Sequence, residues 1–493
     1  MEANDDDELR KFIDDSLDGV EEKVEREMSS DSSKSEKSDS LNAGGRHGGS
    51  PDDIMNNFAK NFGTNGSNFE IPENFGSLMK DFFDNILTKN LDGLVNEDLL
   101  LKSAKEKIGS MNNSSVSALE SEKFLSSLRA ANLWLDSAIE FQPVKSSKIV
   151  STISWLELTL PTWGKIINPS IKAASSAVND NIKGFLDEMN TGSDDAQNAD
   201  HKSMLGFNMN GFQGMLPLGD PKKMGSVLNN IVSTTLSSQF GSTIGSFAKS
   251  AIGSTDLLIP LLDNQEVLIP QNVRKFAKEA VVDLDEATSF LALREASGAR
   301  LFNAAPWIRG YALILLENMT DGLNTLINSI DNETSSSMNI SEMFGSLNQE
   351  ESETTKKAKE QLGQLLVLID TWIDHAVFRA GAPHIHNLTK MQEAFIRNRT
   401  SNSEPQIASE ELLGTRPKLS LYGKYKSFWE KISLKLGDSL RDNMWLHPDT
   451  MPNTDAFENV DAFIVGNPKY RGITLNGDAE NIKIDHDWDS LLK

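Results

Sequence analysis

One segment of the chain carries apolar or small residues around the whole circumference of a helix, so it has to be buried on every side. Residues 283–302 read DLDEATSFLALREASGARLF. The Asp283 side chain can accept a hydrogen bond from a backbone N–H at the N-cap. The Glu286 side chain, three residues later, can bond back to the backbone N–H of Asp283, and this pairing starts a helix. Between Ala287 and Ala299 only Arg294 and Glu295 are charged. A helix without a solvated stripe belongs in a core, and an unpaired charge there costs several kcal/mol. Other elements must therefore surround this helix and face its two charges.

Helical spacing also runs through most of the chain, from about residue 75 to 465. Segments 147–159 and 165–189 show it, with Pro161 between Trp155 and Trp163 predicting a break. Alternation typical of strands is almost absent, and only 257–270 and the last 25 residues could supply short extended pieces. The predicted fold class is mainly α. In the clearest segment, 118–142, the apolar stripe consists of Leu119, Phe124, Leu128, Leu135 and Ile139.

The two ends of the chain differ from this middle part in composition. Residues 1–41 hold 15 Asp and Glu against 6 Lys and Arg and finish in a serine-rich run, so they bury too little apolar surface to offset the entropy of ordering. A Gly-rich and Asn-rich linker follows. We expect a disordered acidic tail and linker over 1–74, a helical domain over 75–465 and a C-terminal tail over 466–493. Deleting 1–41 is expected to leave stability unchanged.

Composition excludes several classes of function. The chain has no cysteine and seven histidines, so disulfide scaffolds, zinc ribbons, iron–sulfur clusters and thiol nucleophiles are excluded. A net charge of −24 without a basic cluster argues against a nucleic-acid partner. No apolar run is long enough for a membrane span, and the acidic N-terminus does not match a secretory signal. A cytoplasmic location is expected, and the sequence names no partner.

Residues 204–254 are rich in Gly, Met and Ser, and no charge occurs from Met224 through Ala248. Ser237, Gly241 and Gly245 form a row of small residues that allows two helix backbones to approach closely. Two readings are open. The segment could be a membrane-active glycine zipper, or it could be a buried helical hairpin, which we favour because Ser, Thr and Asn interrupt the run throughout.

A second helix is predicted over about 355–380, and it offers partners for the two buried charges. Its core stripe contains leucine, isoleucine and valine, whereas Asp370 and Asp374 lie four residues apart on one face and His375 follows. Two carboxylates one turn apart suit either a metal ion or a guanidinium. They could also line a wet seam between helices, because acidic residues on helices are usually exposed.

Several of these strings, in this order, resemble a known family. The chain is similar to an actinobacterial group of zinc-dependent, metalloprotease-like hydrolases with a zincin-like fold, one branch of which is associated with coenzyme F420 biosynthesis. The resemblance runs from about Ala118 to Val465 and rests on RAANLWLDSA, the two tryptophans that flank Pro161, ALREASGARLF, PWIRG, IDTWIDHAVFRA, LLGTRP, RDNMWLHPD and MP.

The resemblance implies a zinc motif, H-E-x-x-H, in which two histidines one turn apart hold the metal and the glutamate polarises a water. Here the aligned residues are Arg294, Glu295 and Gly298. Arg294 has no lone pair to offer, and Gly298 has no side chain. Glu295 keeps the general-base position, and Asp370, Asp374 or His375 lies where a third ligand is implied. Zinc, the expected cofactor of the family, is therefore predicted to be lost.

These observations leave three hypotheses. The leading one is a zincin-like protein that is catalytically silent and acts as a structural or binding module, with Arg294 paired to Asp370 or Asp374 in place of the metal. Under this leading hypothesis, Glu295→Gln is expected to have little effect on the protein. The second is an active hydrolase or peptidase whose unusual ligand set is drawn from Asp370, Asp374, His375 or His384, the last from a short H-x-H pair with His386. The third, a minor one, is a membrane-active glycine-zipper protein.

Overall fold

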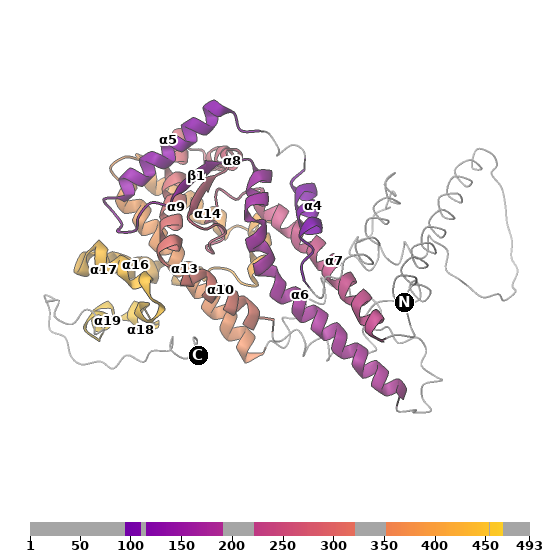
Figure 1. Ribbon diagram of the computed structural model, residues 1–493. Helices are drawn as coiled ribbons and strands as arrows, with labels where there is room; N and C mark the ends of the chain where they lie inside the picture. The colour runs from indigo at the N-terminus through magenta and orange to yellow at the C-terminus, as the bar shows by residue number, and fades with distance from the viewer. Residues whose placement is uncertain (1–93, 110–114, 191–220, 321–351, 453, 467–493) are drawn as a thin grey trace, which may run out of the picture. The chain divides into compact units, whose positions relative to one another are not determined.

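The structure is a computed structural model that describes residues 94–109, 115–190, 221–320, 352–452 and 454–466 (Figure 1). It confirms a mainly α fold, because helices account for most of these residues and the strands are two short segments. The tail predicted over 1–74, the onset of order near residue 75 and the tail predicted over 466–493 lie outside the described residues.

The described elements follow one another in a simple order along the chain. They are α4 (Glu97–Ile108), α5 (Ala118–Leu135), β1 (Ser146–Ile149), α6 (Thr152–Asn190), α7 (Pro221–Ala248), β2 (Gln265–Leu268), α8 (Pro270–Ala280), α9 (Leu284–Ala304), α10 (Trp307–Asn318), α13 (Glu353–Gly381), α14 (Leu388–Thr400), α15 (Glu404–Leu413), η5 (Leu419–Leu421), α16 (Tyr422–Leu436), α17 (Asp438–Asn443), η6 (Met444–Leu446), η7 (Pro448–Thr450), α18 (Thr454–Glu458) and α19 (Val460–Gly466).

Helix α9 is the buried helix that the sequence requires. Every residue from 290 to 302 is buried, and α5, α8, α13 and β2 pack around it (Figure 1). Asp283 caps it as predicted, accepting from the backbone N–H groups of Asp285 and Glu286. The predicted return bond from Glu286 to the backbone of Asp283 is replaced by another contact. The Glu286 carboxylate accepts a hydrogen bond from the Asn387 side-chain amide at 2.8 Å. The start of α9 is thereby tied to the start of α14.

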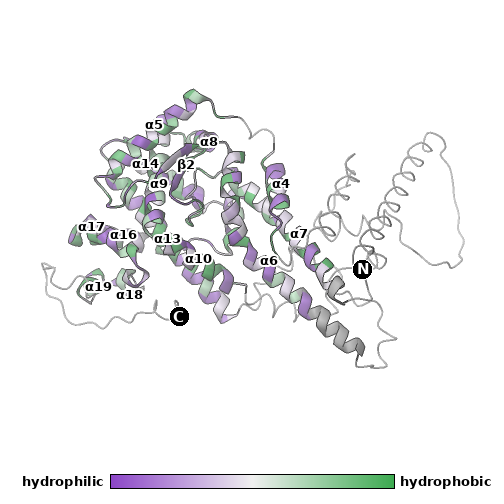
Figure 2. Ribbon diagram, in the orientation of Figure 1, coloured by the Kyte–Doolittle hydropathy of each residue, from purple (hydrophilic) through white to green (hydrophobic). Residues whose placement is uncertain are grey.

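Helix α5 confirms most of the predicted apolar stripe. Phe124, Leu128 and Leu135 are buried, and Ile139 is buried just beyond the helix end. Leu119 is the exception, because it is 85% exposed in the first turn. Both hydrophobic and hydrophilic residues are visible along this helix (Figure 2).

The break predicted at Pro161 is wrong, because α6 continues through it from Thr152 to Asn190. The carbonyl that a residue at position 161 would normally bond belongs to Glu157, an exposed residue, so water can satisfy it. Trp155 and Trp163 are both fully buried and meet edge to face at 6.2 Å. Their burial outweighs the loss of one helical hydrogen bond.

A two-stranded parallel sheet lies between these helices. β2 falls within the 257–270 segment that was predicted to supply an extended piece, and it pairs with β1 in the register Ser146 with Gln265 and Ile149 with Leu268. β1 is unexpected, because helix was predicted from residue 147. Gly253 bridges to Leu268 on the other side of β2, so β2 holds the loop that follows α7 in place.

The row of small residues lies on α7 and packs against α4. The Ser237 hydroxyl accepts from the backbone N–H of Asn96 at 2.8 Å. A Cβ added at Gly241 would lie 2.4 Å from the Leu100 carbonyl oxygen, and one at Gly245 would lie 2.6 Å from the Ala104 carbonyl oxygen. The described part of the predicted hairpin is thus one long helix, and residues 204–220 lie outside the description. Within the described residues, no helix is both long and apolar enough to cross a membrane.

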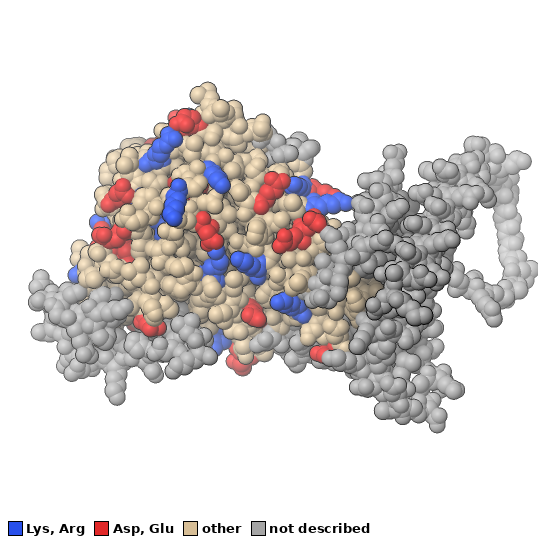
Figure 3. Space-filling view, viewed as in Figure 1, with Lys and Arg blue, Asp and Glu red and all other residues tan. Residues whose placement is uncertain are grey.

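Helix α13 confirms the helix predicted over 355–380. Its core stripe is buried and consists of Leu362, Leu366, Ile369, Ile373 and Val377. The helix packs against α9 on one side and α16 on the other. On the face seen in Figure 3, lysines and arginines alternate with acidic residues over the described surface, without a broad patch of either sign.

Candidate functional site

Arg294 of α9 lies between two carboxylates of α13. One terminal guanidinium nitrogen pairs with Asp370 and the other with Asp374, and the three side chains are at most 7% exposed. The two aspartates are one helical turn apart, so their carboxylates project side by side and match the fork of a guanidinium. Burial lowers the pKa of Arg294 to about 10, while Asp370 opposes that shift. Arg294 therefore remains charged at neutral pH, and its single positive charge faces two carboxylates, of which Asp374 has its pKa raised to about 7 by burial.

Two further elements close over this ion-pair cluster. The Phe395 ring of α14 covers Arg294, with the guanidinium carbon 4.0 Å from the ring centroid, a cation–π contact. Tyr422, the first residue of α16, donates its phenol O–H to Asp374. Arg399 of α14 places its Nε 3.9 Å from the second carboxylate oxygen of Asp370. Arg294, the two aspartates and these three residues form what we call the Arg294 cluster.

Glu295 points away from that cluster, into the loop between α7 and β2. Its carboxylate accepts five hydrogen bonds: the backbone N–H and hydroxyl of Ser254 at 2.9 and 2.6 Å, the same two groups of Thr255 at 3.1 and 2.7 Å, and the backbone N–H of Val267 at 2.9 Å. Five donors occupy the acceptor positions of both oxygens. Burial nevertheless raises the pKa of Glu295 to about 7. The carboxylate anchors the loop.

Gly298 is on the same side of α9 as Glu295, one turn later, and it faces Thr255. A Cβ at Gly298 would lie 2.9 Å from the Thr255 Cβ and 3.0 Å from the Thr255 hydroxyl. Gly253 likewise faces Glu295, because a Cβ there would lie 2.3 Å from its carboxylate oxygen. The loop therefore lies directly against this face of α9, and glycine at both positions allows the close contact.

The histidines that the sequence offered as candidates lie elsewhere. The Nε2 of His375 is 2.9 Å from the Ser433 hydroxyl of α16, and burial, with Arg441 nearby, lowers the pKa of His375 to about 3. His384 stacks on Trp134 of α5 with the ring centroids 4.3 Å apart. His386 donates its backbone N–H to Glu286. Of the four candidates, only Asp370 and Asp374 reach Arg294.

The comparisons with known proteins bear on this geometry. A family model described as zincin-like metallopeptidase matches residues 95–464, which includes α9, α13 and every residue of the Arg294 cluster. The chain belongs to the zincin-like metallopeptidase family. Among curated proteins, no match was found. Among solved structures, this zincin-like chain is similar to a protein from Chloroflexus aurantiacus, described as a candidate hydrolase with a novel fold. The similarity has 14% identity and a TM-score of 0.49, and covers 76% of this chain and 98% of the other.

The residues of this zincin-like chain do not fit the zinc ion that its family name implies. Arg294 and Gly298, which the sequence resemblance aligns with the two histidines, offer no metal ligand, and Thr255 fills the space beside Gly298. Glu295 has all its acceptor positions occupied by protein donors. In the described parts of the chain, no three His, Asp or Glu side chains converge as metal ligands would. The space between α9 and α13 instead holds a guanidinium.

Three members of the Arg294 cluster were missed by the sequence reasoning. Phe395, Arg399 and Tyr422 belong to segments whose helical pattern is ordinary and whose charges look solvated. A weak signal was present, since Arg397 and Arg399 lie two residues apart on α14 in an acidic chain. Ser254 and Thr255, which hold Glu295, carry no recognisable motif. Only the folded chain brings them to α9.

Proposed function

We propose that this zincin-like protein is catalytically silent and acts as a structural or binding module. The observation that carries the proposal is how the two charges of α9 are held: Arg294 pairs with Asp370 and Asp374, while Glu295 is committed to five donors of the protein itself. A general base must reach a water or a substrate proton. The donors around Glu295 leave it no such partner.

In this proposal the guanidinium of Arg294 takes the place of the lost metal and stabilises the fold in a similar way. In an active zincin, a divalent ion holds its ligands together; here a guanidinium holds two carboxylates that would otherwise repel each other. Shape is retained while the Lewis acid is lost. Membership of the F420-associated branch remains a prediction from the sequence resemblance.

The test combines metal content with activity. The full chain, purified without chelator, is expected to contain far less than one zinc per chain, to keep its melting temperature when zinc or a chelator is added, and to release no product from casein or short peptide amides. Asp370→Asn is the comparison variant, because it would alter any ligand set that uses this aspartate.

One zinc per chain, removed by chelator together with stability, would overturn the proposal. Zinc-dependent hydrolysis that is lost in Asp370→Asn would also overturn it and would favour an active hydrolase. Hydrolysis of equal rate in both proteins that neither zinc nor a chelator changes would come from a contaminant and would leave the chain silent.

A further inference from the structure

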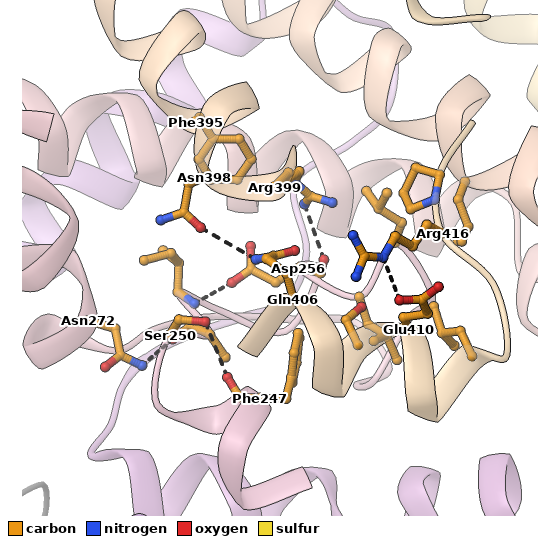
Figure 4. Close-up of a pocket in the computed structure, with 18 of the residues that line it drawn as sticks. Phe247, Ser250, Asp256, Asn272, Phe395, Asn398, Arg399, Gln406, Glu410 and Arg416 are labelled. Atoms are coloured by element: carbon orange, nitrogen blue, oxygen red, sulfur yellow. Dashed lines mark hydrogen bonds and ion pairs between the residues drawn. The ribbon is translucent and has the colours of Figure 1, made fainter. Parts of the chain in front are cut away.

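A cleft opens beside the Arg294 cluster, and the proposed function assigns it no role. Figure 4 shows its polar side, where Asn398 and Arg399 of α14 face Gln406 and Glu410 of α15, and Arg416 lies beyond the end of α15. The loop that follows α7 closes the opposite side with Asp256. A second, smaller hollow shares Arg399 and Arg416 and reaches Asp370 and Tyr422. The two hollows therefore meet at the two arginines.

The floor of the cleft is apolar. It is formed by side chains from the loop after α7 and from α13, α14 and α15, which gives a ligand a concave surface with a water-excluding base. The apolar residues nearest the arginines are Ile252, Leu257, Leu366, Phe395 and Leu413, and all five are buried in the fold. A short hydrocarbon chain lying on this floor would gain about 0.8 kcal/mol for each methylene that it buries.

The two arginines have donor capacity that the protein does not use. Arg416 pairs through Nε with Glu410 at 2.6 Å and through one terminal nitrogen with Asn402 at 3.1 Å, and its side chain is 37% exposed. Arg399 donates through one terminal nitrogen to the backbone carbonyl of Asp256 at 3.1 Å. Its Nε is buried and lies 3.9 Å from the Asp370 carboxylate, so only its terminal nitrogens are left for a ligand. Both guanidiniums border the cleft, so together they can receive a planar anion.

The surrounding charges and the shape of the guanidiniums bear on which anion fits. Three cations of the lining face three carboxylates, so the cleft is electrically balanced before a ligand enters; the residues are Lys275, Arg399 and Arg416 against Asp256, Glu279 and Glu410. A monoanion gains two guanidinium contacts against these carboxylates. A phosphate of charge close to −2 would double both the attraction to these cations and the repulsion from these carboxylates, so net charge does not select between the two anions. The choice of a carboxylate rests on shape, because the planar guanidinium fork matches a planar carboxylate.

We infer that this cleft binds a small amphiphilic monocarboxylate, with its head between Arg399 and Arg416 and its hydrocarbon part on the apolar floor. The inference deepens the proposed function, on which it rests, by giving the silent module a class of ligand. It uses no metal and no reaction step. Glu295 and Arg294 have no direct part in it, because they are buried below Phe395 and the loop after α7.

The experiment measures binding of octanoate to the full chain by calorimetry, with octan-1-ol and octyl phosphate as the other two probes. Octanoate is expected to bind and to raise the melting temperature, and both comparison probes are expected to bind at least tenfold more weakly. Arg416→Gln is expected to weaken octanoate binding about tenfold or more. The matched control is Arg397→Gln, an exposed arginine of α14 outside the cleft, which should bind as the unaltered chain does.

Three results would overturn the inference: octan-1-ol binding as tightly as octanoate, octyl phosphate binding more tightly, or Arg416→Gln binding octanoate unchanged. If Arg416→Gln were to melt early, Arg416→Lys, which keeps the charge and loses the fork, replaces it, and unchanged affinity there would count against the two-arginine head site. These outcomes are separate from those for the silent site. Zinc and hydrolysis decide that question, whatever the carboxylate result.

Discussion

A buried guanidinium between two buried carboxylates fixes how α9 and α13 meet. Replacing Arg294 by alanine leaves Asp370 and Asp374 in the interior without their cation. We expect the free energy of unfolding to fall by about 3–5 kcal/mol, because breaking a buried pair leaves uncompensated charge. Urea unfolding measures it. Arg397→Ala, at an exposed position, is the control and should change stability by less than about 0.5 kcal/mol.

A second measurement separates charge from packing at this position. If stranded carboxylates cause the loss, adding Asp370→Asn and Asp374→Asn to Arg294→Ala should recover part of it. A triple variant no more stable than Arg294→Ala would indicate that the loss comes from the contact with Phe395 and the space left behind.

The raised pKa of Glu295 predicts that the stability of the fold depends on pH. Burial raises its pKa from the ordinary 4.5 to about 7 in the folded chain, so between these values the folded chain holds a proton that the unfolded chain has released. Stability from this group is therefore complete below about pH 4.5 and is lost as the pH rises through 7, by up to about 3 kcal/mol. Unfolding by urea at pH 5.5 and pH 8 should show the decline. In Glu295→Gln the decline should be smaller, and an equal decline would exclude Glu295 as its source.

The same residue corrects an expectation drawn from the sequence. Glu295→Gln was expected to matter little in a silent protein. With three backbone N–H groups and two hydroxyls directed at the carboxylate, an amide NH₂ would face donors. The substitution should therefore lower the stability of the fold, whether or not any water is activated.

Gly298→His tests whether the family ligand can be restored. The imidazole would have to displace Thr255, whose Cβ already lies 2.9 Å from an added Cβ. We expect a loss of about 1–3 kcal/mol from overpacking and no gain in bound zinc, measured by melting and elemental analysis. Gly310→His is the matched control, because nothing lies within 4 Å of its added Cβ. A gain of one zinc per chain in Gly298→His would contradict the expectation.

How far the site could be predicted from the sequence depends on how its residues are connected. The pairing of Arg294 with Asp370 and Asp374 was predictable, because a charge on an all-apolar helix needs a partner and α13 offers two acids on one face. Tyr422, Phe395 and the loop donors at 254 and 255 were not. Their positions depend on how α14, α16 and β2 pack, and no local pattern encodes that packing.

Among the elements, the contact of α7 with α4 makes the sharpest demand on side-chain size. Gly241→Ala would bring a Cβ 2.4 Å from a backbone oxygen of α4, so one helix must move, at a cost of about 1–3 kcal/mol. Gly310→Ala in α10 has free space and should stabilise by about 0.5–1 kcal/mol through helix propensity. Thermal melting of the two variants should show opposite signs, and equal signs would contradict a close helix contact at Gly241.

Helix existence was more predictable than helix boundaries. The stripes of α5, α9 and α13 have the helical period and were recognised. The continuation of α6 through Pro161 was not, because it depends on tertiary burial of Trp155 and Trp163, which outweighs a local rule. β1, four residues long, has too few residues for a strand pattern and forms only because β2 is there to pair with it.

At the scale of the whole molecule, the family match over 95–464 nearly coincides with the described residues. Residues 1–41 lie outside both. Because they are acidic and serine-rich, we expect their deletion to leave the melting temperature unchanged within error. Differential scanning calorimetry of the full and shortened chains measures this. A drop of several degrees would show that the acidic segment binds the remainder of the chain.

The five donors on Glu295 also have a kinetic consequence. The backbone N–H groups of Ser254, Thr255 and Val267 all donate to one side chain of α9, in addition to the backbone bridge between Gly253 and Leu268. Their amides can be protected from hydrogen exchange only while α9 is seated, so the three should exchange together, as a single opening unit. The loop and β2 would then be among the last segments to order during folding, following a helix that lies far along the chain. A carboxylate that catalyses a reaction in other proteins would here determine the order in which segments of this chain fold.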